Sequence, residues 1–589
     1  MSTAAETIET NVPKRLDRLP WSRWHWLVVF ALGFVWILDG LEVTIVGSIG
    51  PTLQKASIHL STFQVGLIGA FYVAGAVCGA LFFGHLTDRW GRKKLFMITL
   101  AVYLVATVAT AFSWNAISFF VFRFFAGAGI GGEYSAINSA IDELIPARVR
   151  GWVDLAINGS WWIGTAAGAL ITIPLLNPEY FSIDVGWRLA FGLGAILGIG
   201  VLLTRRMLPE SPRWLMIKGR QEEAEQIVAD IERRVTEETG EKLDEPGEPI
   251  EIEPRESTGF VAIGRTMFSR YKGRTVLGLT MMSAQAFAYN AVFFTYGLVL
   301  TNLMGAKANH VGYYIVPFAI GNFLGPILLG PLFDRVGRRI MLTFTHATAG
   351  GVLAVTAILF EQQKLTAITL TALWCVVFFF ASAAASAAYL TVSEVFPLEI
   401  RAMAIAFFYA VGTGLGGILG PALFGKLIES NSFRNVAIGF LIAAAWLLVT
   451  AVVTWLLAVD AEQRPLEEVA EPLSATGNED ETGDEGVAEE PTHRERREVG
   501  GYPVRAGAHW SPRYSFHGVD DPLEGQIAAI ERAAAGADRP LSERELLTRT
   551  NARHWGPGVA RRALRRAVGE GRIVREGRGY VAARERVSA

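Results

Sequence analysis

Four ionisable residues interrupt apolar stretches of the sequence, where a charged side chain is costly. Asp39 and Glu42 stand three residues apart, and so on neighbouring positions of one face if their stretch is a helix. Arg123 and Glu133 interrupt another apolar stretch. A charge at the centre of a membrane helix costs at least about 2.5–3.5 kcal/mol, so each of these residues is a candidate for function.

These residue types could move a proton. A carboxylate near Arg123 is stabilised as the anion, whereas one away from it is pushed toward the protonated form. A carboxylate whose partner and access alternate can take a proton on one side and release it on the other. Asp39, Glu42, Arg123 and Glu133 are therefore our candidates for proton coupling. The alternatives are a static Asp39–Arg123 pair, binding of a cationic substrate, and, for Glu133, a place lining water near the inner mouth.

The elements that carry these residues are apolar runs of about 20 residues, which are long enough to cross a bilayer. Each must be helical, because hydrocarbon offers the backbone no other partner. A β-barrel would need shorter alternating segments, which the sequence lacks. We expect twelve transmembrane helices in two sets of six, at 24–48, 62–85, 94–113, 116–140, 152–175 and 187–204, and at 276–304, 310–332, 340–360, 365–392, 401–428 and 436–458.

Basic residues predict the orientation of these helices. They gather before the first run and after the even-numbered runs, as at Lys14, Arg92 and Arg338. The positive-inside rule then places both termini and the central segment in the cytoplasm. The first twenty residues lack an apolar core, so we expect no cleavable signal peptide. The sequence predicts a multi-pass protein of the cytoplasmic (inner) membrane.

An internal repeat relates the two sets of helices. GHLTDRWGRKK at 84–94 recurs as GPLFDRVGRRI at 330–340, and ELIPARVRG at 143–151 recurs as EVFPLEIRA at 394–402. Two charged motifs at matching places indicate two related six-helix bundles with a substrate path between them. The alternative is that the first motif is only a tight turn with positive-inside charge.

These motifs resemble those of the major facilitator superfamily. PESPRWL at 209–215 points to its sugar-porter and metabolite–proton symporter branches, and RFFAGAGIGGE at 123–133 resembles its fourth-helix signature. The resemblance covers roughly residues 20–470 and implies an MFS fold that works by alternating access. It also implies that Glu42, in GLEVTIVG, occupies the place of the sugar–proton symporters' first-helix acid, which pairs with the fourth-helix arginine. Asp39, in LDG, matches an acid of the aromatic-acid and metabolite symporters.

The same resemblance implies a cytoplasmic gate, a network of loop charges that holds the inner side shut while the outside is open. Such a network can set the balance between two states although each surface pair is weak. Carried over to this sequence, the gate comprises Gly84, Asp88, Arg89, Gly91, Arg92, Glu143, Arg150, Glu210, Asp334, Arg335, Gly337, Arg338, Glu394 and Arg401.

The expected substrate pocket departs from that of the sugar porters. AQAFAYNAVFFTY at 284–296 is similar to the family's QQxxGxNxxxYY, but Ala284 and Ala288 replace a glutamine and a glycine. Amides suit neutral polyols, and aromatic rings suit a ring-bearing acid equally well. We therefore favour an organic or aromatic acid slightly over a sugar, with packing as the alternative role of each ring. The candidate substrate-binding residues are Asn158, Trp161, Trp162, Gln285, Asn290 and Tyr389.

The segments outside the helical sets have their own character. We expect a cytoplasmic N-terminus at 1–23, bundles at 24–204 and 276–458, a loop with short helices at 205–275 and a disordered acidic linker at 459–521. Residues 522–589 predict a basic winged-helix-like α+β domain of three helices and a hairpin. Its third helix carries four arginines on one face, at 561, 562, 565 and 566. Such a stripe could contact anionic lipid or the acidic linker, bind DNA, or remain solvated.

Several functions are excluded by what the sequence lacks. It contains no GxxxxGK[ST] nucleotide-binding loop, and no nucleophile–base or metal constellation. We expect no enzyme activity, no cofactor and no metal, and we expect Cys78 and Cys375 to be packing residues. The sequence predicts a monomeric secondary transporter for a small organic metabolite with proton symport. The alternatives are a proton-driven exporter of drugs or metabolites, a uniporter, and a transporter–sensor whose C-terminal domain binds DNA or anionic lipid.

Overall fold

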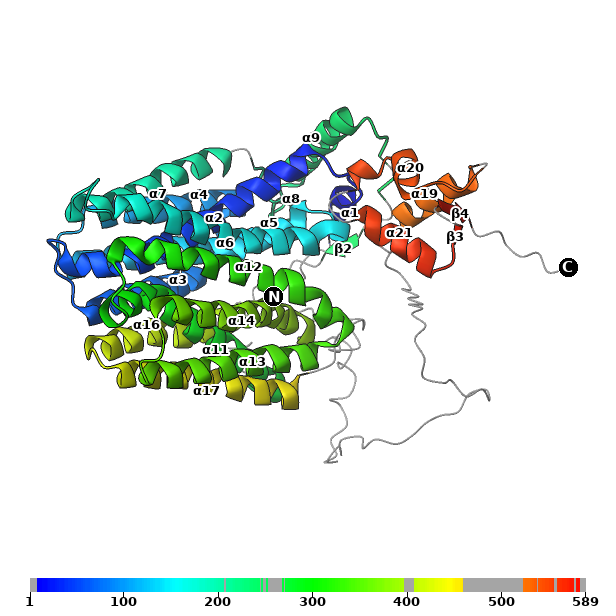
Figure 1. Ribbon diagram of the computed structural model, residues 1–589. Coiled ribbons are helices and arrows are strands. Elements are labelled where there is room, and N and C mark those ends of the chain that lie inside the picture. The colour runs from blue at the N-terminus through cyan, green and yellow to red at the C-terminus, as the bar shows by residue number, and fades with distance from the viewer. Residues whose placement is uncertain are drawn as a thin grey trace, which may run out of the picture.

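The computed structural model describes residues 8–205, 208–243, 245–246, 250–252, 267–269, 271–396, 407–458, 523–537, 539–555, 559–576 and 579–582. Long helices lie side by side in one bundle, and a small domain stands beyond one end of it (Figure 1). We call that end the tail end and the opposite end the far end. Among the described residues, eleven helices are long and apolar enough to cross a membrane.

The first set consists of α2 (Arg23–Lys55), α3 (Thr62–Trp90), α4 (Arg92–Ala111), α5 (Ala116–Leu144), α6 (Ala147–Leu175) and α7 (Ile183–Arg205). Small residues bring the helix backbones together, as in other membrane bundles. A Cβ on Gly75 or Gly79 of α3 would lie within about 2 Å of a backbone oxygen of α5. The pairs α3–α5, α2–α6 and α4–α7 pack extensively.

The second set consists of α11 (Lys272–Leu298), α12 (Val311–Arg335), α13 (Arg338–Glu361), α14 (Ala367–Val395), α16 (Gly414–Glu429) and α17 (Phe433–Leu457). Two π-helical turns extend α11 and precede α16, namely η1 (Val299–Leu303) and η3 (Tyr409–Thr413), and a 3-10 turn, η2 (Ala308–His310), precedes α12. The pairs α12–α14, α11–α16 and α13–α17 pack extensively. These are the counterparts of the first set's pairs, so the repeat in the sequence reappears as a repeat in packing.

The repeated motif also has a repeated backbone geometry. Gly91 and Gly337 stand directly before α4 and α13, with φ angles of 91° and 110°. Only glycine adopts these angles without strain, which accounts for its presence in both copies of the motif.

One of the twelve expected spans, α6, is not among these eleven helices, although it has 29 residues. Asn158, Ser160 and two tryptophans lower its mean hydropathy. This helix packs along α2 of its own set and α12 of the other. Its polar composition therefore coincides with a place between the two sets.

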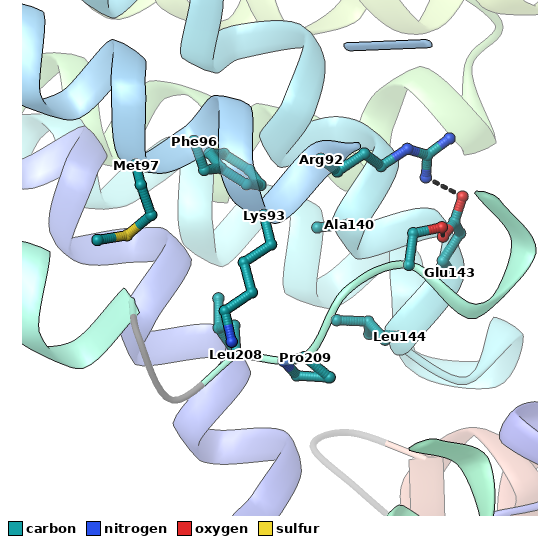
Figure 2. Close-up of a pocket in the computed structure, with 10 residues that line it drawn as sticks. Arg92, Lys93, Phe96, Met97, Ala140, Glu143, Leu144, Leu208 and Pro209 are labelled. Atoms are coloured by element: carbon teal, nitrogen blue, oxygen red, sulfur yellow. Dashed lines mark hydrogen bonds and ion pairs between the residues drawn. The ribbon is translucent and has the colours of Figure 1, made fainter. Parts of the chain in front are cut away.

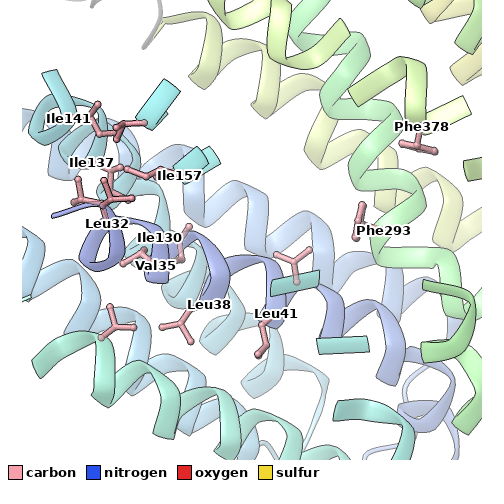
Figure 3. Close-up of a cluster of buried hydrophobic side chains, with 14 of the residues drawn as sticks. Leu32, Val35, Leu38, Leu41, Ile130, Ile137, Ile141, Ile157, Phe293 and Phe378 are labelled. Carbon is pink, nitrogen blue, oxygen red and sulfur yellow. The ribbon is translucent and has the colours of Figure 1, made fainter. Parts of the chain in front are cut away.

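Buried aliphatic side chains fill the first half (Figure 3). Leu32, Val35, Leu38 and Leu41 follow one side of α2 and are almost fully buried. They belong to the same buried cluster as Ile130, Ile137 and Ile141 of α5 and Ile157 of α6. Packing of this side of α2 against α5 and α6 places Asp39 and Glu42, on the same helix, inside the bundle.

The tail end carries short elements whose pairing could not be predicted from the sequence. These are β1 (Ile8–Thr10), α1 (Val12–Asp17), α8 (Pro212–Ile217), α9 (Gln221–Thr239) and β2 (Ile250–Ile252), and β1 pairs with β2 in antiparallel register. Arg15 and Arg18 of the N-terminal segment form ion pairs with Glu232 of α9, at 2.7 and 2.6 Å. Burial raises the pKa of Glu232, but hydrogen bonds from the two arginines outweigh it, so that the pKa falls below its usual value. The N-terminus and the central loop are thereby joined.

The C-terminal domain contains three helices and a hairpin, in the expected order. Its elements are α19 (Glu524–Ala535), α20 (Glu543–Arg549), the short η5 (Ala552–His554), α21 (Val559–Gly569), β3 (Ile573–Glu576) and β4 (Gly579–Ala582). Leu541, between the first two helices, forms a bridge with Tyr580 of β4. Ser542 and Glu545 form a capping box at the start of α20. The expected linker at 459–521 lies outside the described residues.

Candidate functional site

A buried ion pair joins α2 to α5 at the centre of the first half. Glu42 and Arg123 pair directly, and their exposed fractions are 1% and 0%. Thr107 of α4 donates a hydrogen bond to Glu42 Oε1 at 3.0 Å, and Arg123 Nε donates to Thr110 Oγ1 at 3.3 Å. The guanidinium carbon also lies 5.0 Å from the centre of the Phe191 ring. Removing one member of such a pair leaves an uncompensated buried charge, so the pair is sensitive to protonation.

The second carboxylate of α2 has different partners. Asp39 is 4% exposed, and it accepts hydrogen bonds from the Tyr72 hydroxyl at 2.5 Å and from Trp161 Nε1 at 2.8 Å. The Tyr72 ring lies 5.7 Å from the guanidinium carbon of Arg123. One tyrosine of α3 therefore contacts both the Asp39 carboxylate and the cation that holds Glu42.

The fourth candidate for proton coupling stands apart from this centre. Glu133 is 1% exposed and lies on α5, ten residues beyond Arg123. At 1.5 Å per residue, about 15 Å of helix separates the two residues. Glu133 is therefore a separate buried carboxylate, nearer to the tail end.

An aromatic cluster fills the space where the two halves meet. Trp161 and Trp162 of α6 lie 5.2 and 5.8 Å from the Phe293 ring of α11, between ring centres. Tyr289, also on α11, packs edge-to-face against Phe378 of α14, with 4.9 Å between ring centres. Trp161 also binds Asp39, so the cluster is continuous with the carboxylate of α2. A planar, apolar ligand would find a matching surface here.

The other expected pocket residues lie in different environments. Gln285 Oε1 is buried and accepts no hydrogen bond within the described part of the chain. The Asn290 side-chain amide donates to the Ala286 carbonyl at 2.8 Å, and Asn158 is exposed on α6. The side chain of Tyr389 lies outside the described residues.

Sequence reasoning missed the hydrogen-bond partners of these groups. Besides Tyr72, Thr107 and Thr110, it missed Asn322 of α12, which is fully buried and accepts a hydrogen bond from the Tyr289 hydroxyl at 2.9 Å. A polar residue in an apolar run is a signal in itself. A single tyrosine or threonine in a membrane helix is too common for its partner to be named from the sequence.

Close glycine contacts bring the halves together toward the far end. A Cβ on Gly47 of α2 would lie 2.2 Å from the Phe293 carbonyl oxygen of α11. A Cβ on Gly66 of α3 would lie 2.4 Å from the Pro421 oxygen, and one on Gly312 would lie 2.3 Å from the Ala169 oxygen. Each glycine faces backbone of the other half, so the halves are in tight contact between the ion pair and the far end.

At the tail end, part of the expected gate comes together (Figure 2). Arg92 and Glu143 form an ion pair, and the Ser211 hydroxyl donates to the same Glu143 carboxylate. Glu210 accepts hydrogen bonds from the backbone N–H groups of Arg92 at 2.9 Å and Lys93 at 3.0 Å. This carboxylate thus caps the N-terminus of α4, where the helix dipole favours negative charge.

The remaining gate candidates divide into two groups. Gly84 has open space around it, Gly91 and Gly337 make the turns already described, and Arg338 is 6% exposed. The side chains of Asp88, Arg89, Arg150, Asp334, Arg335 and Glu394, and the whole of Arg401, lie outside the described residues. Ser211 was missed, although a serine before Pro-Arg-Trp-Leu is a signal for the N-cap that it forms.

Known proteins resemble this chain over most of its length. Residues 22–473 match a family described as "Sugar (and other) transporter". The chain is 28% identical over 465 residues to the niacin transporter NiaP of Acinetobacter baylyi, covering 78% of this chain and 99% of that protein. It is 27% identical to the 4-hydroxybenzoate transporter PcaK of the same species, covering 73% of this chain and 91% of the relative.

Solved structures share the fold. The inward open conformation of the xylose transporter XylE from E. coli matches with a TM-score of 0.59 at 18% identity, covering 76% of this chain and 99% of that chain. The family consists of transporters and not of enzymes, and its match extends over both helical sets. The chain belongs to the sugar (and other) transporter family of the major facilitator superfamily, and it is a multi-pass secondary transporter of small metabolites.

Proposed function

We propose that this transporter carries a small organic acid with an aromatic or unsaturated frame into the cytoplasm together with a proton. The observation that carries the proposal is the continuity between the Glu42–Arg123 pair and the aromatic cluster, through Tyr72, Asp39 and Trp161. Relatives whose names specify niacin, cis,cis-muconate and 4-hydroxybenzoate support an acidic substrate. Solved structures of a proton symporter of xylose, which share this fold, support the proton as the coupling ion.

In this proposal, Glu42 carries the proton. While Glu42 is ionised, it balances the buried Arg123 charge; when it is protonated, Arg123 loses that partner. An anionic substrate carboxylate supplies replacement charge near the same cation. Binding of substrate and binding of a proton thus favour each other, because each compensates for the electrostatic cost of the other.

The aromatic cluster would hold the frame of the substrate. Trp161, Trp162 and Phe293 offer ring faces and edges, and the buried Gln285 oxygen lies on the same helix as Phe293. Stacking of rings contributes about 0.5–1.5 kcal/mol beyond burial of area. A sugar would lack this contribution and would require more hydrogen-bonding groups than the pocket residues keep.

Alternating access follows from the two sets of helices. We count α6 as the twelfth span, because it packs between α2 and α12. The sets at 24–204 and 276–458 rock about the aromatic cluster, with the loop at 205–275 as a strap. Both termini are cytoplasmic by the positive-inside rule, so the far end faces outward and its glycine contacts shut the outer side. In the opposite state the inner side shuts at the tail end, where the Arg92–Glu143 cluster of the first set meets the loops of the second set, and the protein works as a monomer.

A ligand screen tests the substrate class. The purified protein is heated with nicotinate, 4-hydroxybenzoate, small aliphatic carboxylates or sugars, and its unfolding temperature is measured. A ligand at 100 times its Kd stabilises the folded protein by about 2.7 kcal/mol. We expect aromatic acids to raise the unfolding temperature, and the Trp162→Leu variant to lose the effect. Stabilisation by sugars alone would contradict the proposed substrate class.

Uptake into proteoliposomes tests the coupling. An inward-directed proton gradient should drive uphill accumulation of the acid identified in the screen, and collapse of that gradient should stop it. Accumulation that is indifferent to the proton gradient would identify a uniporter. Proton-driven loss of substrate from loaded vesicles in the cell-like orientation would identify an exporter.

A further inference from the structure

The C-terminal domain is held against the transporter at two points. The Trp21 backbone N–H donates to the His554 carbonyl at 2.5 Å, and the Asn551 side-chain amide donates to Glu241 Oε1 at 2.7 Å. Trp21 stands just before α2, and Glu241 stands just after α9. Figure 1 shows the domain beyond the tail end, next to α1 and α9. The contacts come from the turn between α20 and α21.

This turn lies at the level where the first span begins. α2 starts at Arg23, and its first turns carry Trp26 and Phe30, which are 36% and 58% exposed. Exposed aromatic rings at the start of a span are typical of the boundary between membrane and water. Trp21, and with it His554, therefore lies close to one membrane surface.

The neighbouring helix α21 presents a basic face. Val559, Ala563, Leu564 and Ala567 are buried in the domain, whereas the arginines at 561, 562 and 565 are exposed. Arg566 pairs with Glu570 at 2.7 Å, but in the described part of the chain Arg561 and Arg565 have no acidic partner. Arg561 lines the same hollow as Asn551, so the basic face begins beside the contact with Glu241.

We propose that the exposed arginine face of α21 binds the anionic phospholipid headgroups of the leaflet in which α2 begins. Guanidinium groups bind phosphate in a bidentate manner, and basic residues near an anionic surface contribute to membrane binding while they lie within a Debye length of about 8–10 Å. The inference rests on the proposed cytoplasmic position of the tail end, because the cytoplasmic leaflet carries the anionic lipid.

Duplex DNA would also complement an arginine face on a third helix. The contacts with Trp21 and Glu241 favour the membrane, because they hold the α20–α21 turn, and Arg561 beside it, against the transporter. A duplex bound beside this turn would lie near the anionic leaflet, which repels its phosphates. Binding of DNA is therefore an outcome that the test must detect.

The test uses the full-length protein in lipid nanodiscs that contain phosphatidylcholine alone or with increasing phosphatidylglycerol. Hydrogen exchange of the α21 amides reports whether this helix is covered. The double variant R561Q/R565Q removes two charges from the proposed face. R532Q/R575Q removes two exposed charges from α19 and β3 of the same domain and serves as the matched control.

We expect phosphatidylglycerol to slow exchange in α21, and high salt to abolish the effect. At about fivefold per arginine, R561Q/R565Q should weaken the dependence on phosphatidylglycerol by about 25-fold, while R532Q/R575Q retains it. Equal exchange in neutral and anionic discs would overturn the inference, as would protection by a DNA duplex in neutral discs without protection by phosphatidylglycerol. Both results leave uptake untouched, so they are distinguishable from a failure of the proposed transport function.

Discussion

Replacing Glu42 with glutamine removes the proposed proton site while keeping its size. The buried pair with Arg123 then loses its negative member, and leaving one partner of a buried pair alone costs about 3–5 kcal/mol. Moving a two-state equilibrium from 1:99 to 99:1 takes about 5.5 kcal/mol, so this change suffices to displace the balance of conformations substantially. The substitution should therefore affect coupling and the resting conformation together.

The assay is accumulation in proteoliposomes under a pH gradient of one unit. Such a gradient provides about 1.36 kcal/mol per proton, which sets tenfold accumulation at equilibrium for one proton per substrate. We expect Glu42→Gln to reduce this ratio to about one, while exchange of labelled for unlabelled substrate continues. Tenfold accumulation by the variant would refute Glu42 as the coupling acid.

Two further variants separate coupling from folding. Thr107→Val removes the hydrogen bond to the Glu42 carboxylate but keeps the carboxyl group, so it should retain accumulation near tenfold at a reduced rate. The double variant Glu42→Gln with Arg123→Gln removes both charges and should recover thermal stability relative to the single variant. It should remain uncoupled, which a purely structural role of the pair would not require.

Three other changes have defined outcomes. Gly47→Ala places a methyl group against the α11 backbone and should disfavour closure at the far end. Faster labelling of a cysteine introduced at that end would report the change. Gly192 has open space around it, so Gly192→Ala should have no such effect. Trp161→Phe keeps a ring but loses the hydrogen bond to the Asp39 carboxylate, so transport efficiency should fall about tenfold to a hundredfold. Hydrogen bonds from Arg539 and then Ser542 lower the pKa of Glu545 from 4.5 to about 2, so this carboxylate stabilises the C-terminal domain above about pH 4.5 and loses that effect as the pH falls toward 2. A pH titration of the domain's unfolding temperature checks this, and Glu545→Gln should flatten the curve in that range.

Most of the architecture could be predicted from the sequence, because long apolar runs have only one way to satisfy their backbones in a membrane. The amphipathic pattern at 221–235 likewise indicates α9, and Ser542 followed by Glu545 three residues later indicates the start of α20. Pairing of β1 with β2 could not be predicted, since each has three residues and lies about 240 positions from the other along the chain. The contact of Trp21 with His554 could not be predicted either, because a backbone hydrogen bond does not depend on the residue type.

For the candidate site, the sequence identifies the charged residues but not how they pair. Charged residues in apolar runs identified Asp39, Glu42 and Arg123, because burial of a charge is too costly to be incidental. Which acid would pair with Arg123 depends on the rotation of α2 against α5 and α6, and the sequence allowed both. The structure assigns Glu42 to Arg123 and Asp39 to Tyr72 and Trp161.

This division of partners bears on how coupling could work. If Asp39 and Glu42 shared one cation, the loss of a proton from either would be compensated locally and the substrate cluster would be unaffected. Here Trp161 lies in the aromatic cluster and binds Asp39, while Tyr72 binds Asp39 and lies against Arg123. A change of charge at Glu42 can therefore reach the cluster through Arg123, then Tyr72, then Asp39. Tyr72→Phe breaks this chain at one hydrogen bond without removing a charge, so it should lower accumulation while the Glu42–Arg123 pair stays intact.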